Sequence, residues 1–190
     1  MKGGNDSAKK ADNRQSCADV KRAASQSCAD AKAAANQNFA GGTLRAWTEG
    51  DFDEVENLER QLIDCPWNRA MLASAYSNPN YTCLVYEHDG RLLAYGGYYK
   101  TGDAAEISNI AVSPENQGKG LGRLILNALC DSAKAQKLTS IFLEVGEQNT
   151  KAVCLYTSAG LKRVGQRKDY YGKDRHAIIL KKEFDAEDFA

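Results

Sequence analysis

The most informative segment of the sequence ends an apolar strand and begins a helix, and it reads Ile110-Ala111-Val112-Ser113-Pro114-Glu115-Asn116-Gln117-Gly118-Lys119-Gly120-Leu121-Gly122-Arg123. A proline turn follows the apolar residues, and alternating glycines then lead directly into a helical pattern. Glycines allow a backbone to expose successive N–H groups, and the N-terminus of a helix attracts negative charge. The segment therefore predicts a phosphate-binding loop, to which Lys119 and Arg123 add positive charge.

Other ligands are possible for a glycine-rich loop of this kind. A nucleotide-binding P-loop needs G-x-x-x-x-G-K-[ST], which the segment does not contain. A dinucleotide site needs G-x-G-x-x-G, whereas this loop reads G-x-G-x-G, and the acidic residue that follows, Glu144, falls in mid-strand. A glycine-rich turn without any ligand remains an alternative on the loop alone.

The residues around the loop alternate between strand and helix patterns. Apolar residues recur at helical spacing in 51–63 and 120–137, and shorter helices are predicted at 68–76 and 149–159. The tripeptide His88-Asp89-Gly90 indicates a tight hairpin between two strands. Strands are predicted at 43–47, 81–87, 91–100, 106–112, 139–145, 161–171 and 175–184. This order predicts an α+β fold in which helices cover a sheet.

The composition is that of a soluble globular protein. Hydrophobic residues make up 43% of the 190 residues and charged residues 26%, with a net charge of zero. Neutrality argues against nucleic-acid binding, and no apolar run approaches the roughly 18 residues of a membrane span. The six cysteines lack C-x-x-C spacing, so we expect no metal site. We expect a reducing, cytoplasmic location and no signal peptide.

The chain divides into unequal parts. Residues 1–42 are rich in Ala, Ser and Lys, and Gln15-Ser16-Cys17-Ala18-Asp19 recurs eleven residues later as Gln26-Ser27-Cys28-Ala29-Asp30. Eleven residues are close to three helical turns, which predicts a helical or disordered extension, either solvated or partner-binding. A folded domain is expected over 43–184 and an acidic tail over 185–190.

Several motifs together carry a resemblance to a known family. Gln117-x-x-Gly120-x-Gly122, after Asn109-Ile110-Ala111-Val112, resembles the acetyl-CoA pyrophosphate loop of the GNAT superfamily of N-acetyltransferases. The domain more narrowly resembles the RimI family of ribosomal-protein-alanine N-acetyltransferases. Further matching segments, in the family's order, are Cys65-Pro66-Trp67, Leu143-Glu144-Val145 with Asn149, Ala152-Val153-Cys154-Leu155-Tyr156 with Gly160-Leu161, and Asp169-Tyr170-Tyr171. The resemblance implies the GNAT fold, a mixed and mostly antiparallel sheet flanked by helices; the N-terminal extension has no counterpart in the family.

The resemblance also implies two catalytic residues. The family's general base falls on Glu144, and the apolar neighbours Phe142, Leu143 and Val145 lead us to expect burial and a raised pKa there. The family's general acid falls on Tyr156, whose phenol could protonate a departing thiolate. The structural alternatives are an outward-facing strand glutamate and a core tyrosine. Glu106 is a reserve candidate for the base.

The remaining site residues are expected to bind the two substrates. By resemblance, acetyl-CoA as co-substrate, with no metal, is held by Ile110, Ala111, Val112, Gln117, Gly118, Lys119, Gly120, Leu121, Gly122, Arg123 and Asn149. Asn149 is also a good helix N-cap. Trp67, Tyr170 and Tyr171 are expected to wall a peptide groove, with core packing as the alternative. His176 stands where the family usually has Asp, which leaves recognition of the peptide end in doubt.

The predicted function is acetyl transfer to the N-terminal amine of a protein, possibly a ribosomal protein with an N-terminal alanine. Two alternatives stay open: acetylation of a small amine such as a polyamine or aminoglycoside, and an acetyl-CoA-binding interaction protein. We expect a monomer with no nucleic-acid or membrane partner.

Overall fold

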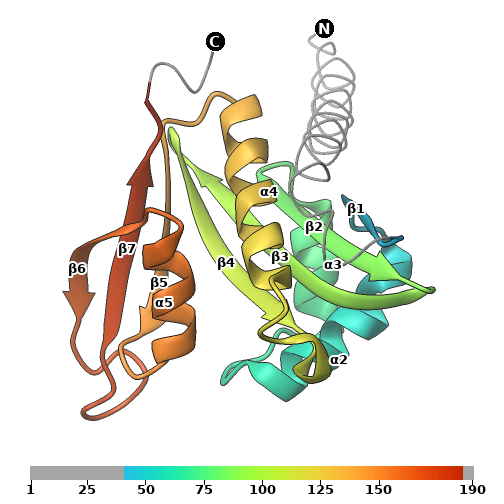
Figure 1. The fold of residues 1–190 in the computed structure, drawn as a ribbon, viewed down its shortest axis with the longest axis horizontal. Helices are drawn as coiled ribbons and strands as arrows, with labels where there is room; N and C mark the ends of the chain where they lie inside the picture. Colours follow the sequence, from blue (N-terminus) through green and yellow to red (C-terminus); the bar gives the residue numbers. More distant parts are fainter. Residues whose placement is uncertain (1–40, 186–190) are drawn as a thin grey trace, which may run out of the picture.

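The fold is a single mixed sheet with helices on both faces, described here by a computed structural model for residues 41–185. The seven strands lie in the order β1-β2-β3-β4-β5-β7-β6 (Figure 1). Residues 1–40 of the predicted extension and 186–190 of the acidic tail lie outside the described residues. The elements are β1 (Thr43–Ala46), η1 (Glu49–Asp51), α2 (Phe52–Leu62), α3 (Arg69–Ser77), β2 (Tyr81–His88), β3 (Arg91–Thr101), β4 (Ala104–Val112), η2 (Pro114–Asn116), α4 (Leu121–Ala135), β5 (Ser140–Gly146), α5 (Thr150–Ser158), β6 (Lys162–Arg167) and β7 (Ala177–Glu183).

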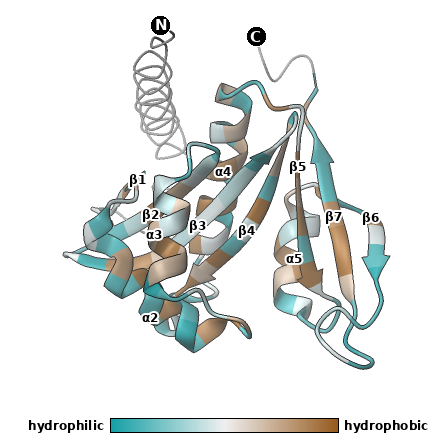
Figure 2. Ribbon diagram, turned by 180° about the vertical axis from the view of Figure 1, so that it is seen from behind, coloured by the Kyte–Doolittle hydropathy of each residue, from teal (hydrophilic) through white to brown (hydrophobic). Residues whose placement is uncertain are grey.

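Two strands in the middle of the sheet separate along their length. All neighbouring strands are antiparallel except β4 and β5, which are parallel and pair only over Ala104–Glu106 and Ser140–Phe142. Both then diverge, as Figures 1 and 2 show. The pairing of β3 with β4 shifts at Ser108, which is an extra residue in β4 and therefore a bulge. Because a bulge bends its strand, β4 turns away from β5 and leaves a gap in the sheet's pairing.

The helices divide the core between the two faces of the sheet. Helix α4 packs Ile125 and Leu129, both fully buried, against one face, and α5 lies on the same side. Helices α2 and α3 bury Val55 and Leu72 against the other face (Figure 2). The predicted apolar stripes of the two long helices are confirmed, because both face the core. The α+β class and the mixed, mostly antiparallel sheet are confirmed as well.

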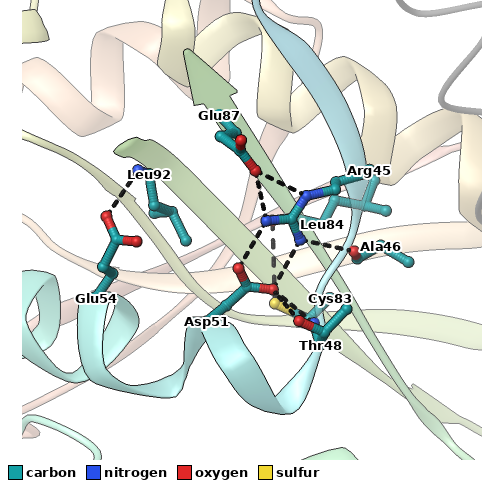
Figure 3. Close-up of polar contacts among 9 residues, drawn as sticks. All are labelled: Arg45, Ala46, Thr48, Asp51, Glu54, Cys83, Leu84, Glu87 and Leu92. Atoms are coloured by element: carbon teal, nitrogen blue, oxygen red, sulfur yellow. Dashed lines mark hydrogen bonds and ion pairs between the residues drawn. The ribbon is translucent and has the colours of Figure 1, made fainter. Parts of the chain in front are cut away.

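A partly buried ion-pair network fixes β1 to β2 and to the start of α2. The Arg45 guanidinium contacts Asp51 and Glu87 at 2.7 Å each, and Asp51 also accepts hydrogen bonds from Thr48 (Figure 3). Burial alone would raise the pKa of Asp51, but the hydrogen bonds from Arg45 and Thr48 outweigh it and hold the pKa below its ordinary value. The network therefore favours the charged carboxylate.

The structure confirms the predicted turn between β2 and β3 and differs from the prediction between β6 and β7. The β2–β3 turn has positive φ at Asp89 and Gly90, as the predicted hairpin requires. The predicted strands 161–171 and 175–184 are shorter than expected, since 168–176 forms a loop. Positive φ at Asp169, Gly172 and Asp174 is incompatible with an extended strand. The paired tyrosines at 170 and 171 consequently lie on a loop rather than in the sheet.

Candidate active site

The glycine loop presents backbone amides at the start of α4. Gly118 and Gly120 have φ of 75° and 100°, and a Cβ at either would meet no heavy atom within 4 Å, so conformation rather than space requires glycine. The first helical bond runs from Leu124 N to Gly120 O at 3.0 Å. The amides of the residues just before Leu124 therefore come before the first hydrogen bond within the helix. Amides in this position can donate hydrogen bonds to an anion.

The side chains of the loop are engaged in holding it together. Gln117 Nε2 donates to Val112 O at 3.2 Å, and Lys119 Nζ lies 3.1 Å from Asn116 Oδ1. The Arg123 guanidinium instead donates to the carbonyl and hydroxyl of Ser158 at the end of α5. The structure therefore directs the charge of Arg123 toward α5 rather than toward the loop.

Gly122 has a different role from the other two glycines. A Cβ at this position would lie 3.1 Å from Leu155 Cδ2, so the missing side chain permits α5 to approach α4 closely. Leu121, by contrast, is almost completely buried in the core. Its side chain anchors the helix while its amide belongs to the loop.

The edge of β4 that faces the gap continues from this loop. Ile110, Ala111 and Val112 pair with Gly96, Tyr95 and Ala94 of β3. Within residues 41–185, the pairing of β4 with β5 stops at Glu106. A strand edge of this kind can pair with an extended ligand as a further strand would.

Glu144 lies on β5 across the gap, in polar surroundings that differ from our expectation. Its side chain is 17% exposed, and Oε1 lies 2.9 Å from Arg167 Nε. The Tyr170 hydroxyl donates a hydrogen bond to Glu144, which raises the pKa of Tyr170. Because side chains alternate along a strand, Leu143 and Val145 point to the opposite face, where they are buried. The expectation of apolar burial for Glu144 is therefore wrong.

Tyr156, on α5, is buried, which agrees with the core-tyrosine alternative and does not test the role of general acid. Its exposed fraction is 8%, and burial, with a smaller contribution from the nearby Tyr171 phenol, raises the pKa of Tyr156 to about 12. The phenol accordingly keeps its proton at neutral pH. Asn149 caps the same helix, since its Oδ1 accepts from Ala152 N at 3.2 Å, which confirms the N-cap alternative without testing a cofactor contact.

The β6–β7 loop brings its tyrosines next to the loop after α2. The rings of Tyr170 and Tyr171 meet edge-on with centroids 4.9 Å apart. The pKa of Tyr171 is raised by burial first, and also by the nearby Tyr170, Glu144, Asp64 and Cys65. Asp64 forms an ion pair with Arg175, so the two loops are joined directly.

Two further residues complete this region. The half-buried Trp67 packs on Tyr81 and Tyr99, with ring centroids 5.7 and 6.3 Å away. His176 Nδ1 accepts a hydrogen bond from Asp169 N at 3.1 Å. His176 thus supports the loop that carries the tyrosines. The ring of Trp67 thus packs on aromatic side chains of β2 and β3, and the substrate-wall role of Trp67 and the tyrosines stays a prediction.

Glu59 and Asn109 are site residues that the sequence analysis missed. Glu59 lies on α2 with no solvent exposure, and burial raises its pKa despite hydrogen bonds from Trp67 N and Asn109 Nδ2. Its position continues the apolar stripe that starts at Phe52 and Val55. A glutamate on a predicted core face was the signal that could have identified it. Glu106, the reserve base, accepts from Thr101 Oγ1 at 3.2 Å.

Neither a metal cluster nor a membrane helix is found in the part of the chain that the structure describes. No three His, Cys, Asp or Glu side chains between residues 41 and 185 are grouped to hold an ion. The helices in that range are all too short or too polar to cross a bilayer.

Comparison with known proteins identifies the family. The acetyltransferase (GNAT) family profile matches residues 43–161. The N-alpha-acetyltransferase RimI of Mycobacterium tuberculosis is 34% identical over 135 residues, covering 68% of this chain and 84% of that protein. The crystal structure of the ribosomal-protein-S18-alanine N-acetyltransferase from Escherichia coli superposes with a TM-score of 0.68 at 28% identity, covering 74% of this chain and 92% of that one. The structure of yncA from Salmonella typhimurium, solved with its cofactor acetyl-CoA, shares the fold at a TM-score of 0.68 and 21% identity, over 77% of this chain and 95% of that one. The chain therefore belongs to the GNAT acetyltransferase family and is an N-acetyltransferase of the RimI-like kind.

Proposed function

We propose that this enzyme transfers the acetyl group of acetyl-CoA to the N-terminal amine of a protein, with a ribosomal protein bearing an N-terminal alanine as the favoured substrate. The names of the relatives from Mycobacterium tuberculosis and Escherichia coli support a protein N-terminus. The observation that carries the proposal is the gap between β4 and β5, which has a row of amides at one end and Glu144 and Tyr156 on its far side.

The residues along β4 and the loop fit acetyl-CoA. Amides of 118–123 would hold the diphosphate, because they precede the first bond of α4 and lie at the positive end of its dipole. The edge of β4 at 110–112 would pair with the amide groups of the pantetheine arm. One of the N–H groups there would polarise the carbonyl of the thioester. When bound, acetyl-CoA supplies the acyl group and a thiolate leaving group.

The two catalytic residues would move protons in opposite directions. An amine attacks a carbonyl only when it is neutral, so Glu144, directly or through a water molecule, would accept its proton. Arg167 and Tyr170 contact the carboxylate and hold it in place. Tyr156 would donate its proton to the departing thiolate, since its pKa of about 12 keeps the phenol protonated beforehand. Glu144 would thus take the proton of the substrate ammonium, and Tyr156 would supply the proton of the coenzyme A thiol.

The loops after α2 and between β6 and β7 would receive the peptide. Trp67 and the tyrosine pair form the aromatic walls, and the Asp64–Arg175 ion pair connects the loops that carry them. Aromatic rings can pack on a short extended peptide while their polar atoms bind its backbone. We propose action as a monomer in the cytoplasm.

The proposal is tested by offering the enzyme matched amines with acetyl-CoA. The set contains a peptide with a free N-terminal alanine and an internal lysine, the same peptide with its N-terminus blocked, spermidine and an aminoglycoside. We expect mass spectrometry to find one acetyl group on the α-amine of the free peptide only. Acetylation of the blocked peptide, or faster turnover of spermidine or the aminoglycoside, would refute the N-terminal assignment.

A further inference from the structure

The carboxylate of Glu59 is buried among neutral hydrogen-bond donors from three separate elements. Tyr95 Oη of β3 and Asn109 Nδ2 of β4 both donate to Oε1, the latter at 2.6 Å. Trp67 N, in the loop after α2, donates to Oε2 at 2.9 Å. With an exposed fraction of 0%, Glu59 is among the most buried side chains of the domain.

Burying a carboxylate in this way is a poor means of stabilising a fold. Removing a charged group from water carries a large penalty, and apolar side chains of similar size often stabilise a core as well or better. The neighbouring stripe positions, Phe52, Val55 and Leu58, are apolar and buried. A polar group at this one position therefore indicates a role that an apolar side chain could not fulfil.

The three donors show what the carboxylate connects. Asn109 immediately precedes the β4 edge proposed for pantetheine and follows the bulge at Ser108. Tyr95 pairs with Ala111 in the adjacent strand. Trp67 belongs to the proposed wall of the peptide groove. One side chain thus joins the wall on the amine side to the strand on the thioester side.

We propose that Glu59 is a positioning residue that sets the peptide wall at Trp67 relative to the β4 strand, and so sets where the amine lies with respect to the thioester. This inference rests on the proposed function of the site. The carboxylate acts through hydrogen bonds and has no part in proton transfer. Its two oxygens accept from all three donors, which neither an amide nor an aliphatic side chain can do.

Replacing Glu59 by Gln tests this role with little change in shape. A glutamine retains one acceptor oxygen and places an NH2 group at the other position, so at least one donor loses its acceptor. We expect kcat/KM for the amine to fall by about tenfold or more, the effect of one buried unsatisfied group, while KM for acetyl-CoA changes less than about twofold. A rise in KM for the amine should contribute to this loss at least as strongly as a fall in kcat.

Two control variants separate positioning from general stability. Glu54→Gln makes the same change on the same helix, where Oε2 accepts from Leu92 N at 2.8 Å. Tyr98→Phe removes buried hydrogen bonds to Ser132 and Gln136 on the α4 side of the sheet. We expect both controls to leave the kinetics of the amine unchanged, even where Tyr98→Phe lowers the melting temperature. Should Glu59→Gln fail to fold, Asn109→Ala removes one donor and carries the same test.

The outcomes distinguish this inference from the proposed function. Kinetics are measured with whichever amine the wild-type enzyme acetylates, so a substrate other than a protein N-terminus would refute only the proposed function. A selective loss of amine kinetics in Glu59→Gln, or in Asn109→Ala, supports the positioning role. Equal losses in Glu59→Gln and Tyr98→Phe, or unchanged amine kinetics in a folded Glu59→Gln enzyme, would overturn it.

Discussion

The glycine at the start of α4 offers a quantitative test of the loop. Gly120 has φ of 100°, and a Cβ at this position would meet no heavy atom within 4 Å, so Gly120→Ala introduces conformational strain without a clash. A left-handed conformation costs an alanine about 1–2 kcal/mol. That strain must appear either in the stability of the free enzyme or in the affinity of the loop for its ligand.

Residues 117–120 of the loop are exposed, so we expect the loop of the free variant to relax and to regain the strain when it binds coenzyme A. A cost of about 1–2 kcal/mol corresponds to a factor of about 5 to 30 in an equilibrium constant. Isothermal calorimetry with coenzyme A should accordingly give a Kd raised by that factor. The unfolding midpoint of the free enzyme should change little.

Gly102 provides the matched control. It has φ of 64°, equally open space, and a place in the turn between β3 and β4, at the end of β4 away from the glycine loop. Gly102→Ala should lower the free energy of unfolding by a similar amount and leave the Kd for coenzyme A unchanged. If Gly120→Ala binds coenzyme A as tightly as the wild type and loses as much stability as Gly102→Ala, the free loop keeps its strained conformation, and the expected relaxation is refuted.

Three further predictions concern the catalytic residues and acid stability. Tyr156→Phe should lower kcat by about 10²- to 10⁴-fold with the Kd for coenzyme A unchanged. In the wild type, a pH–rate profile should show no loss of kcat from Tyr156 deprotonation below about pH 11, because the pKa of Tyr156 is about 12. Glu144→Gln should lower kcat by about 10²-fold or more at neutral pH, in steady-state assays with a saturating amine, and an unchanged rate would remove Glu144 as the base. Asp51 has a lowered pKa in the folded state, so its stabilising contribution is present above its ordinary pKa of 3.8 and is lost as the pH falls through the folded value. Urea titrations at several acidic pH values should show that the free energy of unfolding depends less on pH in Asp51→Asn than in the wild type. An equal pH dependence in the two proteins would contradict the assignment.

The parts of the fold that follow local periodicity were predictable from the sequence. The stripe from Leu121 to Ala133 and that from Phe52 to Leu58 required only helical spacing, and the hairpin at Asp89-Gly90 required only local turn chemistry. The gap between β4 and β5 could not be predicted this way. It depends on the bulge at Ser108, which is a property of pairing between two strands.

The positions of the glycine loop and of the β4 edge were predictable from the sequence, and the roles of their residues stay predictions. The surroundings of Glu144 were not predictable, because Arg167 and Tyr170 reach it from another strand and a loop. Similarly, the engagement of Arg123 with Ser158 depends on the packing of α5 against α4. Glu59 was missed because its role becomes visible only when its three donors are brought together by the fold.

Hydrogen–deuterium exchange with and without coenzyme A locates the cofactor on the domain. We expect binding to slow exchange at two places, the amides of 118–123 and the β4 edge at 110–112, with little change in α2 or β1. Unchanged exchange at both places, or protection confined to another face of the domain, would contradict the position of the cofactor across the gap.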